Sequence, residues 1–192
     1  MQVLTVLCHP RRASLTAALA ERFRAGLAAT GHGGELADLY AERFDPLMLP
    51  PDEPDWNDAN KRYSAAVLAE QARIERHEAI AIVFPVWWWS VPAMLKGWID
   101  RVWNRGWAYD ESRLALRRGL LLGVAAGSAR SYAGKGYGTA METQLVEGVL
   151  RYCNIADARL ELLHDVLDGA AKRSAALERA EVLGREFALG LG

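Results

Sequence analysis

The stretch IAIVFPVWWWSVP, residues 80–92, decides how this sequence folds. It opens with a continuous apolar run, Ile80–Phe84, which is the pattern of a strand buried on both faces of a parallel sheet. Three consecutive tryptophans follow. Pro92 then suits the first turn of a helix, where the missing N–H has no hydrogen bond to lose. The stretch therefore predicts a buried strand, an aromatic loop and a helix in direct succession.

The alternation of strand and helix extends to both sides of this stretch. Further strands are predicted at Val3–Cys8 and Leu120–Ala126, with weaker candidates at Gly34–Leu39 and Leu160–His164. The predicted helices are Ser14–Ala29, Asn60–Arg76, Pro92–Trp103, Thr139–Arg151 and Ala170–Leu189. This alternation predicts an α/β fold, a three-layer sandwich formed by residues 1–192 as a single domain. Because crossovers between parallel strands are right-handed, a five-stranded parallel sheet of order 2-1-3-4-5 is favoured.

Composition limits the possible partners. Hydrophobic residues make up 51% and charged residues 24%, which is the balance of an ordinary globular protein. A net charge of −1 gives no reason to expect nucleic acid or an anionic membrane as a partner. Two cysteines, Cys8 and Cys153, form neither a disulfide framework nor a zinc motif, and we expect no metal site. The first apolar stretch is too short for a signal peptide or a membrane span, so we expect a cytoplasmic protein without membrane insertion.

Two connections are longer than is usual in an α/β domain. Asp45–Asp58 contains four prolines and is typical of a rigid surface loop, and Asn104–Arg118 separates a helix from the next strand. Insertions of this kind often carry function. The alternative is that they only decorate an edge of the sheet.

Ligands of such sheets bind beyond the carboxyl ends of the strands, where the strand order reverses. For the order 2-1-3-4-5 this point lies between the first and third strands. Three loops are then expected to form the site: His9–Thr16, Pro85–Pro92 and Ala126–Gly138.

The first loop offers donors for an anion. Ser14 is the expected N-cap of a helix whose free N–H groups and dipole attract negative charge, and His9, Arg11 and Arg12 add further donors. A capped helix with solvated arginines is an equally good interpretation of the same residues.

The second and third loops suit a flat ligand. Trp87, Trp88 and Trp89 cannot all face one core, so they need a planar ligand, a partner subunit or both, unless they merely cap the sheet. Glycines of the third loop let the backbone approach a ring closely, and Tyr132 and Tyr137 add phenols. A flavin has a phosphate, a broad planar ring and polar edges, and it is the cofactor that needs all three loops.

The residues also carry a family resemblance. The run AEQARIERHEAIAIVFPVWWWSVPAMLKGWIDRVW, Ala69–Trp103, and the opening VLTVLCHPRRASLTAAL, Val3–Leu19, resemble the NAD(P)H:quinone oxidoreductases of the flavodoxin-like superfamily, including its bacterial members. The fragment FPxxWxxxPAxLKGWxDRV is the most specific part of the match. The resemblance implies a flavodoxin-like fold and a bound flavin, with FAD as first choice and FMN as second. It also implies a homodimer with active sites at the subunit interface. The aromatic residues after the tryptophan loop give modest support for a dimer: either Trp98 and Trp103 simply belong to the core, or Trp107 and Tyr109 line the pocket of a neighbouring subunit.

The resemblance carries roles to particular positions. His9, Ser14, Leu15 and Thr16 match the contacts of the flavin phosphate. Pro85, Val86 and the three tryptophans match the segment that holds the isoalloxazine ring, and Gln71 matches a glutamine near the adenylate half of FAD. Ala126, Gly127 and Ser128 correspond to the turn over the pyrimidine edge of the ring, and Tyr132 to a tyrosine that faces both the flavin and the quinone.

One position departs from the family pattern. The animal members have a histidine, assigned to proton or charge relay, six residues after that tyrosine, and this sequence has Gly138 there. Tyr137 is the neighbouring candidate for a catalytic role beside Tyr132. His32, His77 and His164 are expected on helix or strand segments away from the three loops.

The implied activity is a ping-pong reaction. NAD(P)H passes a hydride to the flavin and leaves, and a quinone or similar flat acceptor then takes both electrons. Two alternatives remain open: a flavodoxin-type electron carrier, which the net charge of −1 disfavours, and a regulatory subunit of a potassium efflux system.

Overall fold

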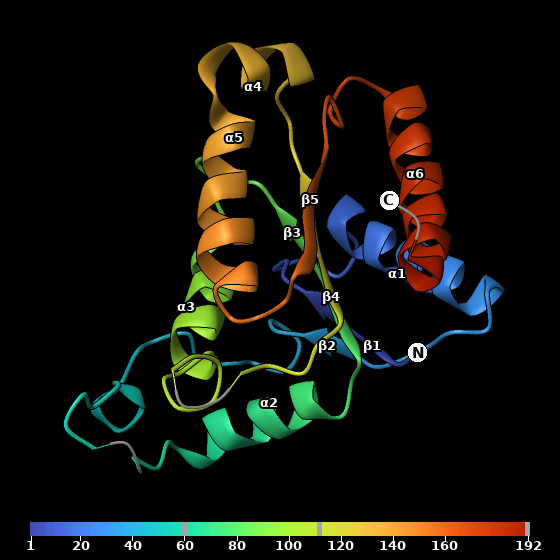
Figure 1. Ribbon diagram of the computed structural model, residues 1–192. Helices are drawn as coiled ribbons and strands as arrows, with labels where there is room; N and C mark the ends of the chain where they lie inside the picture. The colour runs from blue at the N-terminus through green and yellow to red at the C-terminus, as the bar shows by residue number, and fades with distance from the viewer. Residues whose placement is uncertain (59–60, 111–112, 191–192) are drawn as a thin grey trace.

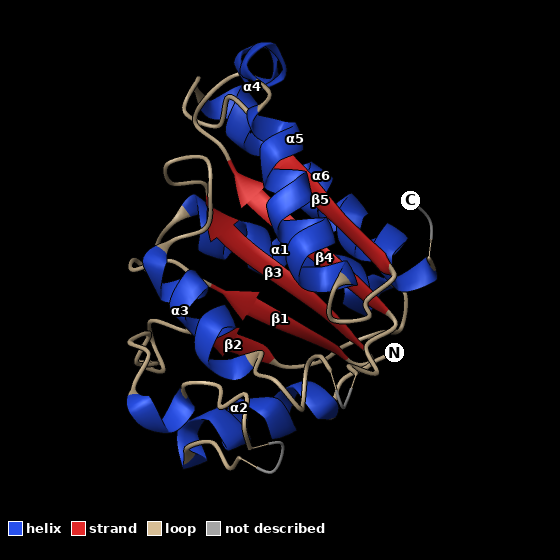
Figure 2. Cartoon of the chain, turned by 60° about the vertical axis from the view of Figure 1, so that its left-hand side comes forward, coloured by secondary structure: helices blue, strands red, loops and turns tan. Residues whose placement is uncertain are grey.

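The apolar runs form one parallel sheet. The computed structural model describes residues 1–58, 61–110 and 113–190. Its strands are β1 (Val3–Leu7), β2 (Leu36–Asp38), β3 (Ala79–Pro85), β4 (Arg118–Val124) and β5 (Asp157–Leu163). They pair in parallel in the order β2-β1-β3-β4-β5, as Figure 2 shows. The predicted fold class and strand order are confirmed.

Helices cover both faces of the sheet (Figure 1). One face packs against α1 (Leu15–Ala29) and α6 (Ala170–Leu189). The other packs against α2 (Ala65–Glu75), α3 (Ala93–Val102), α5 (Tyr137–Met141) and the π-helix η2 (Glu142–Arg151), which continues α5. Alternate strand residues serve the two layers: Leu4 and Val6 face one core, and Val3 and Leu7 face the other.

The α1–α6 contact depends on two glycines. A Cβ placed on Gly26 would lie 2.1 Å from the carbonyl oxygen of Glu181, and one placed on Gly184 would lie 2.1 Å from that of Phe23. The two helices therefore approach to backbone contact, which no other residue type permits at these positions.

The boundaries of several elements differ from the predictions. The fourth strand ends at Val124 instead of Ala126, and Pro92 precedes its helix as the N-cap residue. The glycine-rich segment Ala126–Gly138, predicted as a loop, contains the short helix α4 (Ala129–Lys135). Its ends are fixed by Ser128, which caps the first turn, and by the left-handed Gly136. Asn60, the predicted start of the second helix, lies outside the described residues, and α2 begins after Ser64, its N-cap.

The proline-rich segment Asp45–Asp58 is held by a group that we call the polar clamp: Asp52, Ser64 and Arg101. The Asp52 and Arg101 side chains are 1% and 4% exposed, with 2.6 Å from Arg101 Nη2 to Asp52 Oδ2. Ser64 donates its N–H and its hydroxyl to the same carboxylate, and Arg101 also donates to the Asp45 carbonyl oxygen. Burial raises the pKa of Asp52, but the hydrogen bonds from Arg101 and Ser64 and the Arg101 charge outweigh it, so the pKa is lowered. The clamp joins this segment to α2 and α3, which favours the structural interpretation.

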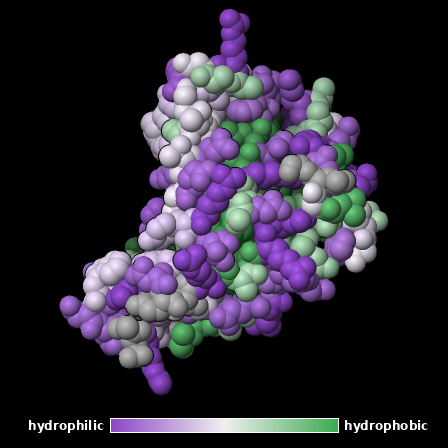
Figure 3. All heavy atoms as spheres, in the orientation of Figure 1, coloured by the Kyte–Doolittle hydropathy of each residue, from purple (hydrophilic) through white to green (hydrophobic). Residues whose placement is uncertain are grey.

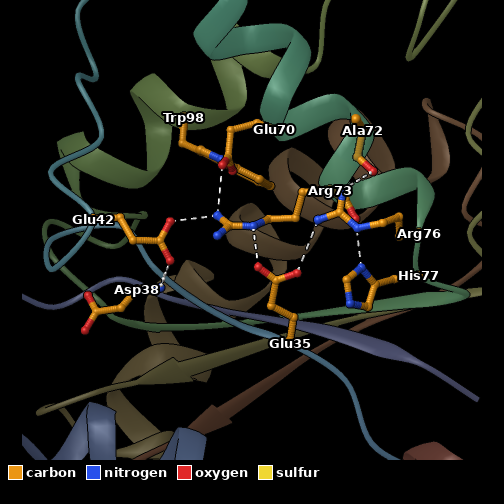
Figure 4. A network of polar contacts seen from close by, with 9 residues as sticks. All are labelled: Glu35, Asp38, Glu42, Glu70, Ala72, Arg73, Arg76, His77 and Trp98. Atoms are coloured by element: carbon orange, nitrogen blue, oxygen red, sulfur yellow. Dashed lines mark hydrogen bonds and ion pairs between the residues drawn. The ribbon is translucent and has the colours of Figure 1, made fainter.

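A second polar network attaches α2 to the edge of the sheet (Figure 4). Arg73 lies 2.7 Å from oxygens of both Glu35 and Glu42 and 2.8 Å from Glu70. Glu70 also accepts a hydrogen bond from the indole N–H of Trp98, at 2.8 Å. These contacts connect α2 and α3 to the residues around β2.

The surface agrees with the composition. Most of the face drawn in Figure 3 is hydrophilic, with smaller hydrophobic patches between. Across the described ranges, we find no helix with the length and apolar character needed to span a membrane. The same residues contain no cluster of His, Cys, Asp and Glu that could hold a metal ion.

Candidate functional site

The three predicted loops meet at the carboxyl edge of the sheet. Parallel bonding continues past the strand ends: the N–H of Cys8 donates to the Val83 carbonyl at 3.0 Å, and that of Val86 to the Val124 carbonyl at 2.9 Å. The loops also touch through their rings. The His9 and Trp87 centroids are 6.4 Å apart, and those of Trp89 and Tyr137 are 4.2 Å apart in a stacked pair. The edge therefore brings together side chains that are far apart in the sequence.

The first loop ends at the N-terminus of α1. Ser14 caps the helix by accepting the N–H of Ala17 at 3.1 Å, and the first turn leaves backbone N–H groups without a partner inside the helix. Leu15 is half-buried, and Thr16 is buried beside it. The free end of a helix of this length attracts an anion.

His9 adds a donor to this end of the helix. Its Nδ1 lies 3.0 Å from the Arg11 N–H, which can only donate, so the proton of the neutral ring is on Nε2. Burial lowers the pKa of His9; the hydrogen bond with the Arg11 backbone raises it and the Arg11 charge lowers it, and the net lowering favours this neutral form. Cys8, the residue before it, is buried, and burial raises the pKa of its thiol to about 12. The thiol therefore stays protonated and is no nucleophile.

The second loop is a tight turn, Trp87–Ser90, which we call the tryptophan turn. Trp87 and Ser90 exchange two backbone hydrogen bonds of 3.1 Å each. The two central residues, Trp88 and Trp89, have φ values of 51° and 54°. A turn of this kind prefers Asn-Gly, because φ is positive at both central positions. Bulky residues there cost about 1–3 kcal/mol each, and strain of this size gathers at functional sites.

The tryptophan turn has exposed side chains as well as a strained backbone. Trp87 is 42% exposed, Trp88 88% and Trp89 41%, while Pro85 and Val86 before them lie against the core. Three large aromatic side chains thus present faces to solvent at one edge of the sheet. A surface of this kind marks a ligand or partner site.

The third segment supplies a backbone turn and two phenols. Ala126 and Gly127 are exposed, and Ser128 caps α4 by accepting the N–H of Ser131 at 3.2 Å. Tyr132 is buried, and burial raises the pKa of its phenol, which therefore stays protonated at neutral pH. Its ring meets that of Tyr137 edge to face at 5.9 Å.

The predicted position of His164 was wrong. His164 directly follows β5, and its ring meets the ring of Tyr132 at 4.7 Å. Its Nδ1 lies 3.2 Å from the Gly127 carbonyl oxygen. The strand order contained the signal, because β5 neighbours β4 and the residue after β5 must lie beside the turn after β4. His32 and His77 lie elsewhere, as predicted: His32 contacts the chain N-terminus, and His77 contacts the carbonyl of Arg73.

The predicted contact of Gln71 with a cofactor also fails. The side chain is buried under α2, and its Nε2 donates to the Val102 carbonyl at 2.9 Å. Val67, Gln71 and Ile74 are the buried residues of α2, which is the spacing of one helix face. Gln71 therefore stabilises the contact between α2 and the end of α3.

The aromatic residues after the tryptophan turn divide into two groups. Trp98 and Trp103 are buried in the core, and their ring centroids are 6.0 Å apart. Trp107 and Tyr109 are only half-buried: Trp107 donates its indole N–H to Glu75 at 2.6 Å, and Tyr109 lies 5.6 Å from the exposed Tyr152.

Comparison with known proteins gives this geometry a family. The family model described as the flavodoxin-like fold matches residues 1–183. The chain belongs to this family. It is 36% identical to the uncharacterized NAD(P)H oxidoreductase YcaK of Escherichia coli, over 88% of this chain and 87% of that protein. It is 29% identical to NAD(P)H dehydrogenase [quinone] 1 of Rattus norvegicus, over 86% and 69%.

A solved structure agrees with these relatives. The chain superimposes on the NAD(P)H:quinone oxidoreductase from Methanothermobacter marburgensis with a TM-score of 0.93 and 30% identity, covering 97% of this chain and 96% of that one. Membership of the quinone oxidoreductase branch of the flavodoxin-like family, predicted from Ala69–Trp103, is confirmed, and the chain is an enzyme of the oxidoreductase class.

No steric clash explains why this protein has Gly138 where the animal members of the family have a histidine. A Cβ placed on Gly138 meets no atom within 4 Å, so a side chain would fit there. Gly138 lies in α5, next to Tyr137, which stacks on Trp89.

Proposed function

We propose that this enzyme is a flavin-dependent NAD(P)H oxidoreductase that reduces a quinone or a similar flat acceptor. The observation that carries the proposal is the strained and exposed tryptophan turn, at the same edge of the sheet as the N-terminus of α1 and the Gly127 turn. The chemistry of the site suits a flavin, because α1 offers N–H groups to a phosphate, the tryptophans offer a flat wall, and the exposed Ala126–Gly127 turn offers backbone groups to the polar edge of a ring. Oxidoreductase relatives with the same fold support the assignment.

Each candidate residue has a defined task in this proposal. His9 Nε2 and the N–H groups of Leu15 and Thr16 would hold the phosphate. Within the tryptophan turn the Trp87 N–H is already used by Ser90, so Trp88 and Trp89 remain as candidate backbone donors there. When bound, the flavin supplies hydride acceptance from NAD(P)H and two-electron reduction of the acceptor.

Tyr132 and Tyr137 would act on the acceptor side. Tyr132 keeps its phenol proton, so it can donate a hydrogen bond to an acceptor oxygen that gains negative charge. Tyr137 contacts both Tyr132 and Trp89, so it would lie beside the space in which a flat acceptor meets the flavin. We propose that nicotinamide and acceptor occupy the same place over the flavin in turn, which gives a ping-pong order.

We propose FAD as the cofactor, with FMN as the alternative. The Gln71 side chain gives FAD no support, since it is buried and hydrogen-bonded. Beside the first loop, however, lies an open groove of about 640 Å³, lined by residues that include Arg12, Ser14, Ala18 and Arg173. The groove has the size of a small-molecule site, which suits the adenosine half of FAD, and its lining includes two arginines, Arg12 and Arg173, and two carboxylates, Glu21 and Asp38.

A homodimer would complete the site. Trp88 remains largely exposed, and a second groove of about 330 Å³ is lined by residues that include Trp56, Trp103, Tyr109 and Tyr152. Aromatic residues are enriched in protein interfaces. We therefore propose that a second copy covers this aromatic surface, and sedimentation of the holoprotein as a monomer would overturn that part.

Two measurements test the proposed function. Heat release of the bound cofactor, followed by chromatography, should give FAD, while FMN would remove the role of the Arg12–Arg173 groove. Initial rates at several NAD(P)H concentrations should give parallel double-reciprocal lines as quinone is varied. Intersecting lines would contradict the ping-pong order. A bound flavin that neither NADH nor NADPH reduces would favour an electron carrier or a regulatory subunit.

A further inference from the structure

We infer that His164 is a positioning residue that holds the Gly127–Ser128 peptide and the Tyr132 ring in place at the flavin site, an inference that rests on the proposed function for its role in turnover. His164 makes two contacts with the third segment of the site. Its Nδ1 lies 3.2 Å from the Gly127 carbonyl oxygen, and its ring meets the Tyr132 ring at 4.7 Å with planes 71° apart.

The hydrogen bond fixes the tautomer of His164. A carbonyl oxygen only accepts, so Nδ1 must carry a proton for this bond to form. The neutral ring is then protonated on Nδ1, the opposite of the arrangement in His9, where Nδ1 accepts a backbone N–H. The two histidines of the site are therefore distinguishable by the nitrogen that holds the proton.

The Gly127 carbonyl oxygen accepts a second hydrogen bond, from the backbone. Gly127 O also accepts the N–H of Asp165 at 3.3 Å, and the N–H of Val166 reaches the Ala125 carbonyl at 3.5 Å. The segment after β5 thus continues to bond the segment after β4 beyond the strands. His164 is the side-chain member of this attachment.

The hydrogen bonds to the Gly127 carbonyl also set the direction of the Ser128 N–H. Across a planar trans peptide, the C=O of Gly127 and the N–H of Ser128 point in opposite directions. Because β4 lies between β5 and β3, a carbonyl turned towards β5 turns the Ser128 N–H towards the β3 side, where the tryptophan turn lies. The His164 bond therefore orients a backbone donor of the proposed flavin site.

The ring contact sets the position of Tyr132. Rings follow one another from His164 to Tyr132 at 4.7 Å, to Tyr137 at 5.9 Å and to Trp89 at 4.2 Å. A Cβ on Gly127 would come within 3.2 Å of the Tyr132 ring, so the ring fits closely between Gly127 and its neighbours. Loss of the His164 ring would remove one of the two ring contacts of Tyr132 and leave the one with Tyr137.

Two substitutions separate the two contacts. His164→Asn keeps a side-chain N–H donor near the place of Nδ1 but loses the ring, and His164→Phe keeps a ring but loses the donor. His77→Asn is the matched control, because His77 also bonds a backbone carbonyl but lies away from the site.

We expect the holoenzyme variants to lose different properties. His164→Phe should weaken flavin binding about tenfold by titration and leave the kcat for the quinone within about twofold, since one oriented hydrogen bond is lost. His164→Asn should keep flavin affinity within about twofold and lower kcat several-fold. That loss should disappear in a Tyr132→Phe background if it acts through Tyr132. Unchanged flavin affinity in His164→Phe, or an undiminished kcat loss in the double variant, would overturn the inference.

A measurement without flavin or substrate tests the geometry independently of the proposed function. The nitrogen NMR signals of the apoprotein should show His164 protonated on Nδ1, and the Ser128 amide signal should shift in His164→Phe but not in His77→Asn. An Nε2-protonated His164 and an unmoved Ser128 signal would overturn the positioning role. Failure of NAD(P)H to reduce the wild-type flavin, with these NMR results as expected, would instead refute the proposed function alone.

Discussion

The polar clamp and the tryptophan turn are built in opposite ways. In the clamp the Asp52 carboxylate is buried, and it accepts hydrogen bonds from Arg101 and Ser64. In the tryptophan turn the side chains are exposed and two bulky residues have positive φ. Each partner in the clamp depends on the other, because removing one would leave the other charge buried and uncompensated, whereas a strained and exposed turn lowers the stability of the chain.

The difference separates structure from function. Of the segments that the sequence marks as unusual, the proline-rich one is fastened to α2 and α3 and presents no comparable strain among the described residues. In the tryptophan turn, binding of a flavin would offset the free-energy cost of the backbone strain, because the flat ring would cover the exposed aromatic side chains. Substitutions in the clamp should therefore change stability and spare flavin binding, and substitutions in the turn should do the reverse.

The largest expected effect is that of Arg101→Met. It leaves the Asp52 carboxylate buried beside an apolar side chain, which should lower the free energy of unfolding by about 3–5 kcal/mol. Urea unfolding of the apoprotein measures this. Arg117→Met is the control, because Arg117 pairs with Glu78 on the surface and should change stability by less than about 1 kcal/mol. Equal losses in the two variants would mean that the clamp carries no special stability.

The pH dependence of the clamp follows from the lowered pKa of Asp52. A carboxyl group whose pKa is lower in the folded state contributes stability above its unfolded value of 3.8, and the contribution is lost as the pH falls through the folded value. The stability difference between wild type and Asp52→Asn should therefore be constant at neutral pH and shrink below pH 3.8. A difference that grows on acidification would contradict the lowered pKa.

The tryptophan turn should respond in the opposite direction. Trp88→Asn places a residue that tolerates positive φ at a strained and exposed position, so the apoprotein should gain about 1 kcal/mol in unfolding free energy. The affinity for flavin should fall about tenfold with the loss of the aromatic wall. Thermal melts of the apoprotein and flavin titration measure the two effects. Trp56→Asn, at an exposed tryptophan without positive φ, should bring no gain in stability.

The smallest expected effect on the site is that of Gln71→Leu. The substitution removes a buried donor from the Val102 carbonyl, so stability should fall by about 1–3 kcal/mol. Flavin affinity should stay within about twofold, because the side chain lies inside the fold. A large loss of FAD affinity with FMN affinity intact would restore the adenylate role that the resemblance implies.

The sequence predicted the sheet well because its physical signal is strong. A strand buried on both faces needs a continuous apolar run, and Val3–Leu7 and Ala79–Pro85 lie within one residue of their predicted bounds at each end. The single-domain organisation of residues 1–192 stays a prediction. The helix α4 was missed because the four glycines of residues 126–138 favour a loop, although Ser128 and Gly136 mark its two ends.

The site was predictable in outline but not in detail. The strand order placed the three loops together, and it could also have placed His164, which follows the strand next to β4. The burial of Gln71 was readable from its spacing with Val67 and Ile74. The geometry of the tryptophan turn was not readable, because residues of this size rarely occupy both central positions of such a turn.

The most direct test of the flavin assignment is an anaerobic absorption experiment on the purified holoprotein. NADPH or NADH is mixed with the protein, the flavin band is followed, and a quinone is then added. The band should bleach within seconds and return with the quinone, and Trp88→Asn should bind less flavin under the same conditions. A protein that binds no flavin after reconstitution, or whose flavin band neither nucleotide bleaches, would contradict the proposed oxidoreductase.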